Sequence, residues 1–203
     1  LLADDTEQVT QLLDKLRAQG GGTIDLVVDN AGFELCTDLL LADHLVGSGA
    51  ATCVRFRVKH HPTFVSDALE RDVDAHIAEL AKGDGAAASV ARRWGERRAK
   101  GEFVCVADTY WAMPYALWDV PEALYDHLRD SSSLIIVKGD ANYRRALGDR
   151  PWPLDAPFAE VCSYAPAPLL CLRTLKAELG CGMAKQGTDR ASSTDGTLSL
   201  IHI

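Results

Sequence analysis

Short apolar runs alternate along this chain with longer segments in which apolar residues recur at helical spacing. An apolar run bounded by glycine, proline or polar residues predicts a strand, and the helical spacing predicts an amphipathic helix. The strands are predicted at residues 24–28, 52–58, 103–107, 134–137 and 168–172. The helices are predicted at 12–17, 35–45, 68–81, 86–99, 121–129 and 142–147, with Ser66 or Asp67 as the N-cap of the third. Because such alternation is typical of βαβ units, the sequence predicts an α/β fold with a mostly parallel sheet.

The most informative stretch follows the predicted strand at 134–137, which runs directly into Lys138-Gly139-Asp140-Ala141-Asn142-Tyr143-Arg144. Open α/β sheets build anion sites in this way, because a glycine lets the backbone approach closely and the start of a helix offers free N–H groups. Lys138 and Arg144 add positive charge. A lysine at a strand end is often only a solvated edge charge, but the compact grouping favours contact with a phosphate. The spacing is not that of a Walker A loop.

A second predicted strand ends in oxygen ligands. Residues 24–28 lead into Asp29 and Asn30, and Asp67 follows the predicted strand at 52–58 by a few residues. Three oxygen donors without histidine or cysteine suit a hard cation such as Mg²⁺ or Mn²⁺ and not a structural zinc. The pattern leaves alternatives open, since Asp29 and Asn30 equally fit a turn or a helix cap, and Asp67 alone is most often a cap.

Formal charge favours a phosphate site over a cleft of unpaired carboxylates. Asp29, Asp67 and Asp140 together with a bound phosphomonoester would carry about five negative charges at neutral pH, and one divalent cation offsets two of them. The remaining positive charge would come from Lys138, Arg144, Arg173 and Lys176. The aromatic stretch from Tyr110 to Tyr115 either roofs a pocket or packs in the core, and core packing is the usual role.

The composition limits the partners. A net charge of −8 and a pI near 5.2 argue against a general nucleic-acid surface. No stretch approaches the ~18 apolar residues of a membrane span. Six scattered cysteines without a C-x-x-C pair indicate a reducing compartment, so we expect the cytoplasm, with the nucleus as an alternative. The expected partner is a small phosphorylated metabolite, and the oligomeric state stays open.

Four motifs follow one another in the chain. They are Asp29-Asn30-x-Gly32-x-Glu34-Leu35-x-x-Asp38-Leu39, then Phe64-Val65-Ser66-Asp67, then Lys138-Gly139-Asp140-x-Asn142-Tyr143-Arg144 with Gly148-Asp149 and Trp152, then Arg173-Thr174-x-Lys176. In this order they resemble the motifs of the damage-control phosphatase family, which is metal-dependent. The fourth resembles the Arg-Thr-x-Lys motif of its subfamily III. The resemblance covers about residues 24–183, most of the chain.

The resemblance implies a three-layer α/β/α sandwich that acts on sugar phosphates such as fructose 1-phosphate. It implies that Asp29, Asn30 and Asp67 are catalytic and hold the metal, which would be Mn²⁺, Ni²⁺, Co²⁺ or Mg²⁺. The residues that it places against the phosphosubstrate are Asp29, Asn30, Asp140, Ala141, Asn142, Tyr143, Arg144 and Lys176. Lys138, Arg173 and Thr174 would support them.

Two further functions are weighed against the phosphatase. An S-adenosylmethionine-dependent protein-glutamate O-methyltransferase activity has been ascribed to the same subfamily, but the chain has no glycine-rich loop for that cofactor, so it ranks second. A non-catalytic fragment that binds phosphometabolites ranks third. It is considered because only about twenty residues precede the first motif, where the family has a substantial helical region.

These departures from the family pattern give an expected domain organisation. Residues 1–23 would be the remnant of a largely missing N-terminal helical region, and residues 24–185 would be the α/β phosphatase core. Residues 186–203 are rich in Ser, Thr, Gly and Asp and show no periodicity, so we expect a disordered or non-native tail there.

Overall fold

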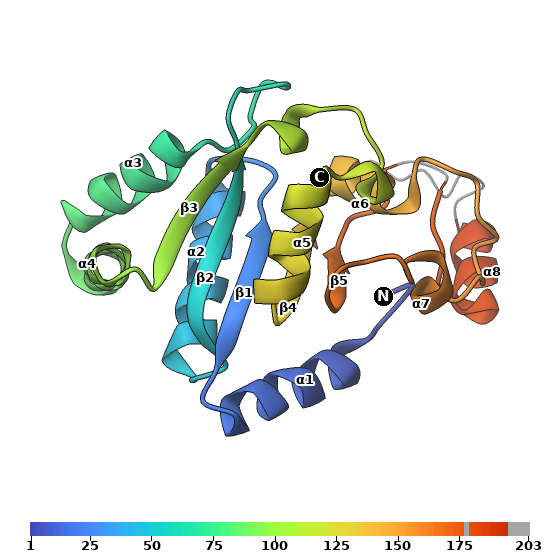
Figure 1. Cartoon of the computed structure of the whole chain (residues 1–203), viewed down its shortest axis with the longest axis horizontal. Helices are drawn as coiled ribbons and strands as arrows, with labels where there is room; N and C mark the ends of the chain where they lie inside the picture. The colour runs from blue at the N-terminus through green and yellow to red at the C-terminus, as the bar shows by residue number, and fades with distance from the viewer. Residues whose placement is uncertain (177–178, 195–203) are drawn as a thin grey trace.

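A five-stranded parallel sheet forms the centre of the protein (Figure 1), in a computed structural model that describes residues 1–176 and 179–194. Its strands are β1 (Gly22–Val27), β2 (Ala51–Lys59), β3 (Phe103–Asp108), β4 (Leu134–Lys138) and β5 (Leu169–Leu172). They lie in the order β3-β2-β1-β4-β5, and every neighbouring pair is parallel. Each strand falls where the hydrophobic pattern predicts one, and the predicted parallel sheet is confirmed.

Helices cover both faces of the sheet. On one face lie α2 (Phe33–Gly47), α3 (Glu70–Ala81) and α4 (Gly85–Lys100). On the other lie α5 (Glu122–Ser131) and α6 (Asp140–Leu147), with the short 3₁₀ turns η1 (Thr109–Ala112) and η2 (Leu117–Asp119). In Figure 1, α5 crosses in front of the sheet and α2 lies behind it. Each face has its own apolar core, so the expected α/β/α sandwich is confirmed.

Three helices complete the described chain: α1 (Thr6–Ala18), α7 (Phe158–Val161) and α8 (Lys185–Thr194). The sequence pattern predicted no helix at α8 and placed this segment in a tail without regular structure. Residues 195–203, the rest of that tail, lie outside the described residues, and the division of the chain into domains stays a prediction. Among the residues that the structure describes, no helix has both the length and the apolar character needed to cross a bilayer.

A buried charged cluster anchors the end of α5 to the sheet. Asp25 on β1 is fully buried and accepts hydrogen bonds from Arg55 Nη2 at 2.5 Å and Arg57 Nε at 2.6 Å, both on β2. The hydroxyl of Ser132, just after α5, donates to the same carboxylate at 2.6 Å. Because a buried carboxylate without partners would be very costly, this cluster fixes the position of α5 over the sheet.

Strand register brings the polar strand ends to one edge. Val27 pairs with Arg57 of β2 on one side and with Val137 of β4 on the other. Since the strands are parallel, the residues that follow β1, β2 and β4 meet at the same edge of the sheet, where open α/β sheets bind ligands. The candidate site is built at this edge.

The predicted N-cap of α3 is wrong. The helix begins at Glu70, its N-cap is Leu69, and the Leu69 N–H donates to the Asp72 carboxylate at 2.9 Å. Asp67 instead accepts from the backbone N–H groups of Thr63 and Phe64, on its N-terminal side. The segment from Ser66 to Ala68 pairs with the end of β1 before the helix can start, so Asp67 is free of a capping role.

Candidate active site

The Asp29 carboxylate lies against Gly139, the residue between β4 and α6. A Cβ atom placed on Gly139 would sit 2.1 Å from Asp29 Oδ2. The Gly139 backbone has φ 83° and ψ 167°, a conformation that is essentially restricted to glycine. Because α6 begins at Asp140, the Asp29 carboxylate lies beside a first helical turn whose N–H groups have no acceptor within the helix. The structure thus brings together the two strand ends that the sequence singled out.

Asp67 is brought to the same place by a short backbone pairing. An isolated antiparallel bridge joins Asn30 to Asp67, the Ala31 N–H donates to the Ser66 carbonyl at 2.7 Å, and the Ala68 N–H donates to the Asp29 carbonyl at 3.0 Å. The three oxygen-bearing residues predicted to share a metal therefore lie side by side. The hydroxyl of Ser66 also donates to Asn30 Oδ1 at 2.7 Å.

Lys59 holds the Asp67 carboxylate. The Lys59 ammonium group pairs with Asp67 Oδ1, and both side chains are buried. The N–H groups of Thr63 and Phe64 donate to Oδ2 at 2.6 and 2.7 Å. Burial alone would raise the pKa of Asp67, but the hydrogen bonds from Lys59 and the two N–H groups outweigh it, and the pKa lies below the usual value. The Asp67 carboxylate is therefore ionised at neutral pH.

Asp29 has the opposite environment. Burial raises the pKa of its carboxyl, and the nearby carboxylates of Glu34 and Asp67 raise it further, while Lys59 and Lys176 oppose the shift without cancelling it. This crowding of negative charge is what a bound cation would relieve.

The donor set fits a hard divalent cation only if an amide takes part. Within residues 1–176 and 179–194, no three side chains drawn from His, Cys, Asp and Glu come together as a metal site. The amide oxygen of Asn30 would supply a third oxygen beside those of Asp29 and Asp67. Such an all-oxygen set suits Mg²⁺ or Mn²⁺.

Two of the basic side chains that were predicted to offset the phosphate charge are held by carboxylates around the site. Lys138 at the end of β4 turns toward α2, where its Nζ atom lies 3.0 Å from Asp38 and 3.4 Å from Glu34. The side chain of Arg173, after β5, is largely buried and donates to Asp140 at 2.7 Å, which ties β5 to the start of α6. Both residues therefore pair with acidic side chains next to the site.

Two other predicted cations lie at the surface. Arg144 pairs with Asp149 at 2.7 Å, and both are exposed at the rim of the site. Lys176 is exposed and lowers the pKa of Asp29, so its charge acts on the site. Thr174, two residues earlier, is exposed.

The remaining predicted substrate residues have unequal positions in α6. Ala141 is exposed in the first turn. Asn142 is buried, donates to the Lys138 carbonyl at 3.0 Å and accepts from Arg145 at 2.6 Å, so its amide holds the helix in place. The side chain of Tyr143 points away from the carboxylates, and its hydroxyl accepts from the Cys181 N–H at 3.2 Å.

A cavity of about 470 Å³ opens beside α6, and Lys59, the partner of Asp67, lines it. Lys59, Thr63 and Phe64 form one wall, α6 and the turn after it form another, and the segment from Trp111 to Ala116 forms a third. The aromatic stretch thus has both expected roles, since Tyr110 and Trp111 are buried in the core while its later residues line the cavity.

Arg145 braces the third wall of this cavity. Its guanidinium group donates to the carbonyls of Trp111 at 3.3 Å, Met113 at 2.7 Å and Tyr115 at 3.2 Å. The sequence motifs gave no sign of Arg145. They gave none of Lys59 either, although the rule that ligands gather at strand ends could have found it.

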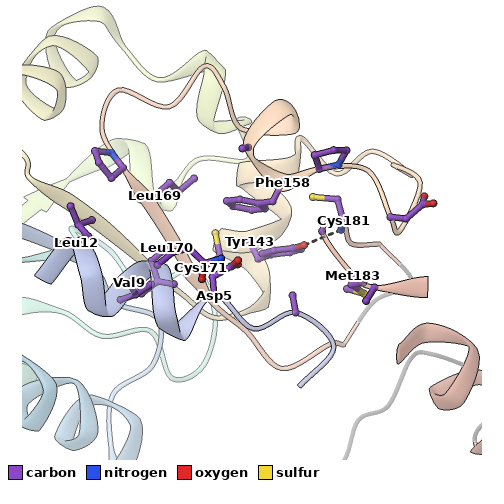
Figure 2. Close-up of a pocket in the computed structure, with 18 of the residues that line it drawn as sticks. Asp5, Val9, Leu12, Tyr143, Phe158, Leu169, Leu170, Cys171, Cys181 and Met183 are labelled. Carbon is purple, nitrogen blue, oxygen red and sulfur yellow. Dashed lines mark hydrogen bonds between the residues drawn. The ribbon is translucent and has the colours of Figure 1, made fainter. Parts of the chain in front are cut away.

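A second cavity of about 740 Å³ lies between α1 and β5. Figure 2 shows the apolar side chains that line it, with Val9 and Leu12 facing Phe158, Leu169 and Met183. Tyr143 also points into this cavity. Its lining is largely apolar, and its charged residues include Lys185, Asp5 and Asp155, so this cavity is separate from the acidic side chains at the strand ends.

Fold and site together define an α/β/α sandwich with a cluster of oxygen-bearing side chains beside a helix N-terminus. A family profile described as the damage-control phosphatase ARMT1-like domain matches residues 1–191. The chain therefore belongs to the ARMT1-like damage-control phosphatase family, as its motifs led us to expect.

Curated relatives agree with this assignment. The chain is similar to proteins named damage-control phosphatase ARMT1, with 36% identity to that of Mus musculus over 203 residues, 37% to that of Homo sapiens over 192 and 34% to that of Danio rerio over 207. The alignments cover 96%, 90% and 96% of this chain and 46%, 43% and 46% of the relatives. The chain thus spans less than half the length of these relatives.

Proposed function

We propose that this chain is a metal-dependent phosphatase domain that hydrolyses sugar phosphate monoesters, with fructose 1-phosphate as a representative substrate. One observation carries the proposal: the Asp29 carboxylate lies against Gly139 at the start of α6, with Asn30 and Asp67 beside it. A cation held by these three side chains would therefore lie next to a phosphate held by the first turn of α6, as a phosphomonoester bound through a metal requires.

Asp29, Asn30 and Asp67 would hold the cation, with Mn²⁺ first and Ni²⁺, Co²⁺ or Mg²⁺ as alternatives. When bound, the metal would polarise a phosphoryl oxygen and orient or activate the nucleophile. Lys59 keeps Asp67 ionised and in place by pairing with it at all stages.

The phosphoryl group would lie on the first turn of α6. The free N–H groups of that turn, aided by the helix dipole, bind phosphate oxygens and stabilise the charge of the transferring group. Lys176 would add a positive charge, which already acts on Asp29. Arg173 would keep the Asp140 carboxylate paired and so prevent it from repelling the phosphate.

The organic part of the substrate would occupy the 470 Å³ cavity, which is lined by Lys59, the partner of Asp67, and by residues of the first turn of α6. Its volume suits a group the size of a sugar and not a macromolecule. The exposed aromatic side chain of Tyr115 offers a face for a sugar ring, and Arg144 lies at the cavity rim.

Phosphate release from a sugar phosphate tests the proposal. With Mn²⁺ present, Asp29→Ala and Asp67→Ala should each abolish metal-dependent turnover, because each removes a ligand. Asp130→Ala is the matched control, since that aspartate is exposed at the end of α5. Undiminished turnover in both site variants would eliminate the proposal.

The two rival functions predict other results. Methyl transfer requires that calorimetry detect binding of S-adenosylmethionine at millimolar concentration, and no binding would remove that alternative. A non-catalytic domain should bind phosphate without turnover even in the presence of Mn²⁺, so measurable hydrolysis would exclude it.

A further inference from the structure

The amide of Asn30 has to face a cation with its oxygen. An amide presents an oxygen ligand at one end and a positively polarised NH₂ group at the other, and the two ends are nearly equal in size. If the amide turned over, the candidate site would lose a ligand and would gain a repulsive group. Some part of the protein must therefore fix which end faces outward.

Two carboxylates accept hydrogen bonds from the Asn30 NH₂ group. Asn30 Nδ2 donates to Asp29 Oδ2 and to Glu34 Oε2, both at 3.0 Å. Both N–H bonds of the amide are thus used on one side, and Oδ1 is left facing Ser66 and the strand that carries Asp67. The reversed amide would point its oxygen at two carboxylates, which is unfavourable. Because Asp29 would share its charge with the cation, Glu34 is the acceptor that keeps its full strength.

Glu34 is itself fixed in place. It lies in the first turn of α2, and its other oxygen, Oε1, lies 3.4 Å from Lys138 Nζ. Lys138 is held in turn by Asp38, at 3.0 Å. Asp38 is almost fully buried, with a side chain 2% exposed. The ammonium group thus sits between two carboxylates of one helix and holds the Glu34 side chain in position.

We propose that Glu34 is a positioning residue that sets the orientation of the Asn30 amide for cation binding, with Lys138 and Asp38 holding Glu34 in place. The inference deepens the proposed function and depends on the proposed cation site. It gives Lys138 a role different from the phosphate contact that its sequence position suggested.

Mn²⁺ affinity, measured by electron paramagnetic resonance of the free ion, tests this role. Glu34→Ala should weaken binding about 10- to 100-fold, the usual cost of removing a partner that orients a metal ligand. Glu34→Gln keeps an oxygen that can accept from Asn30, so it should bind within a few-fold of the wild type. Glu96→Ala removes the same charge from an exposed position on α4 and should leave the affinity unchanged. Equal losses in Glu34→Ala and Glu34→Gln would overturn the proposal, because they would show that only the charge matters.

Substitution of Asn30, the proposed cation ligand, gives an independent test of the role of Glu34. In Asn30→Asp both ends of the side chain are oxygens, so no orientation has to be fixed. Adding Glu34→Ala to Asn30→Asp should therefore leave Mn²⁺ affinity unchanged or improve it, since it also removes a like charge. A loss as large as in the Asn30 protein would contradict the positioning role and indicate general damage to the fold.

An absent cation site and an absent positioning role of Glu34 give different results. If the wild type binds no Mn²⁺, the proposed cation site is wrong and the role of Glu34 falls with it. If the wild type and Glu34→Ala bind Mn²⁺ equally well, the cation site stands and only the positioning role is refuted.

Discussion

Replacing Gly139 with alanine perturbs the contact on which the site is built. The new Cβ atom would lie 2.1 Å from Asp29 Oδ2 and 2.5 Å from its Cγ, so the Asp29 side chain or the start of α6 has to move. The substitution therefore tests whether the two strand ends meet as described.

Two costs add in Gly139→Ala. A non-glycine residue in this backbone conformation costs about 1–3 kcal/mol. Relief of the clash by shifting packed atoms costs about another 1–3 kcal/mol. We expect the free energy of unfolding to fall by about 2–6 kcal/mol, which is a large share of the roughly 5–15 kcal/mol of a typical domain.

Gly101→Ala is the matched control, because Gly101 also has a positive φ of 75°, but a Cβ atom added to it would have no neighbouring atom within 4 Å. It should cost about 1–2 kcal/mol through the backbone alone. Urea unfolding measures both changes, and Mn²⁺ affinity should fall only in Gly139→Ala. If the two variants lost equal stability and bound Mn²⁺ equally well, Asp29 would not contact Gly139 and the site as built would be wrong.

Three further predictions concern the surroundings of the site. Asp25→Ala leaves buried guanidinium groups without their carboxylate, so urea unfolding should show a loss of about 3–5 kcal/mol, and a loss below about 1 kcal/mol would contradict the buried cluster. Burial raises the pKa of Asp38 from 3.8 to about 6, although Lys138 opposes the shift. The folded state then binds this proton more tightly than the unfolded state, and its contribution to stability is lost as the pH rises from about 4 to about 6. The stability of Asp38→Asn relative to the wild type should therefore increase over that range, and a constant difference would refute the shifted pKa. Arg145→Lys keeps the charge but loses the planar fork that reaches three carbonyls, so KM for a sugar phosphate should rise while kcat changes little. A fall of kcat alone would contradict a role in the cavity wall.

The hydrophobic pattern was sufficient to predict the sheet. β3, β4 and β5 are short apolar runs, β1 is an apolar segment interrupted by Asp25, and β2 alternates apolar and polar residues, and such segments are typical of the strands of a buried parallel sheet. The ends of these runs also located Asp29, Asn30 and Asp140 correctly at one edge. The helix start of α3 could not be predicted, because Asp67 has the sequence signature of a cap and only the pairing of its backbone with Asn30 excludes that role.

The hydrophobic pattern could not predict which side chains pair with one another. Lys138 and Arg173 follow strands and look like phosphate ligands, yet in the structure both are held by acidic groups, Lys138 by Asp38 and Arg173 by Asp140. Alternation along a strand predicts the face of the sheet to which a side chain points. The carboxylate that it meets on that face belongs to a helix elsewhere in the chain, and the strand sequence does not reveal it. The roles of Lys59 and Arg145 depend in the same way on packing between elements that are distant in sequence.

A crystal of the chain grown with Mn²⁺ tests the central claim most directly, through the anomalous scattering of the ion. The account predicts one strong peak coordinated by oxygens of Asp29, Asn30 and Asp67, in front of the first turn of α6. A peak at another position, or no peak at a Mn²⁺ concentration that supports turnover, would contradict it.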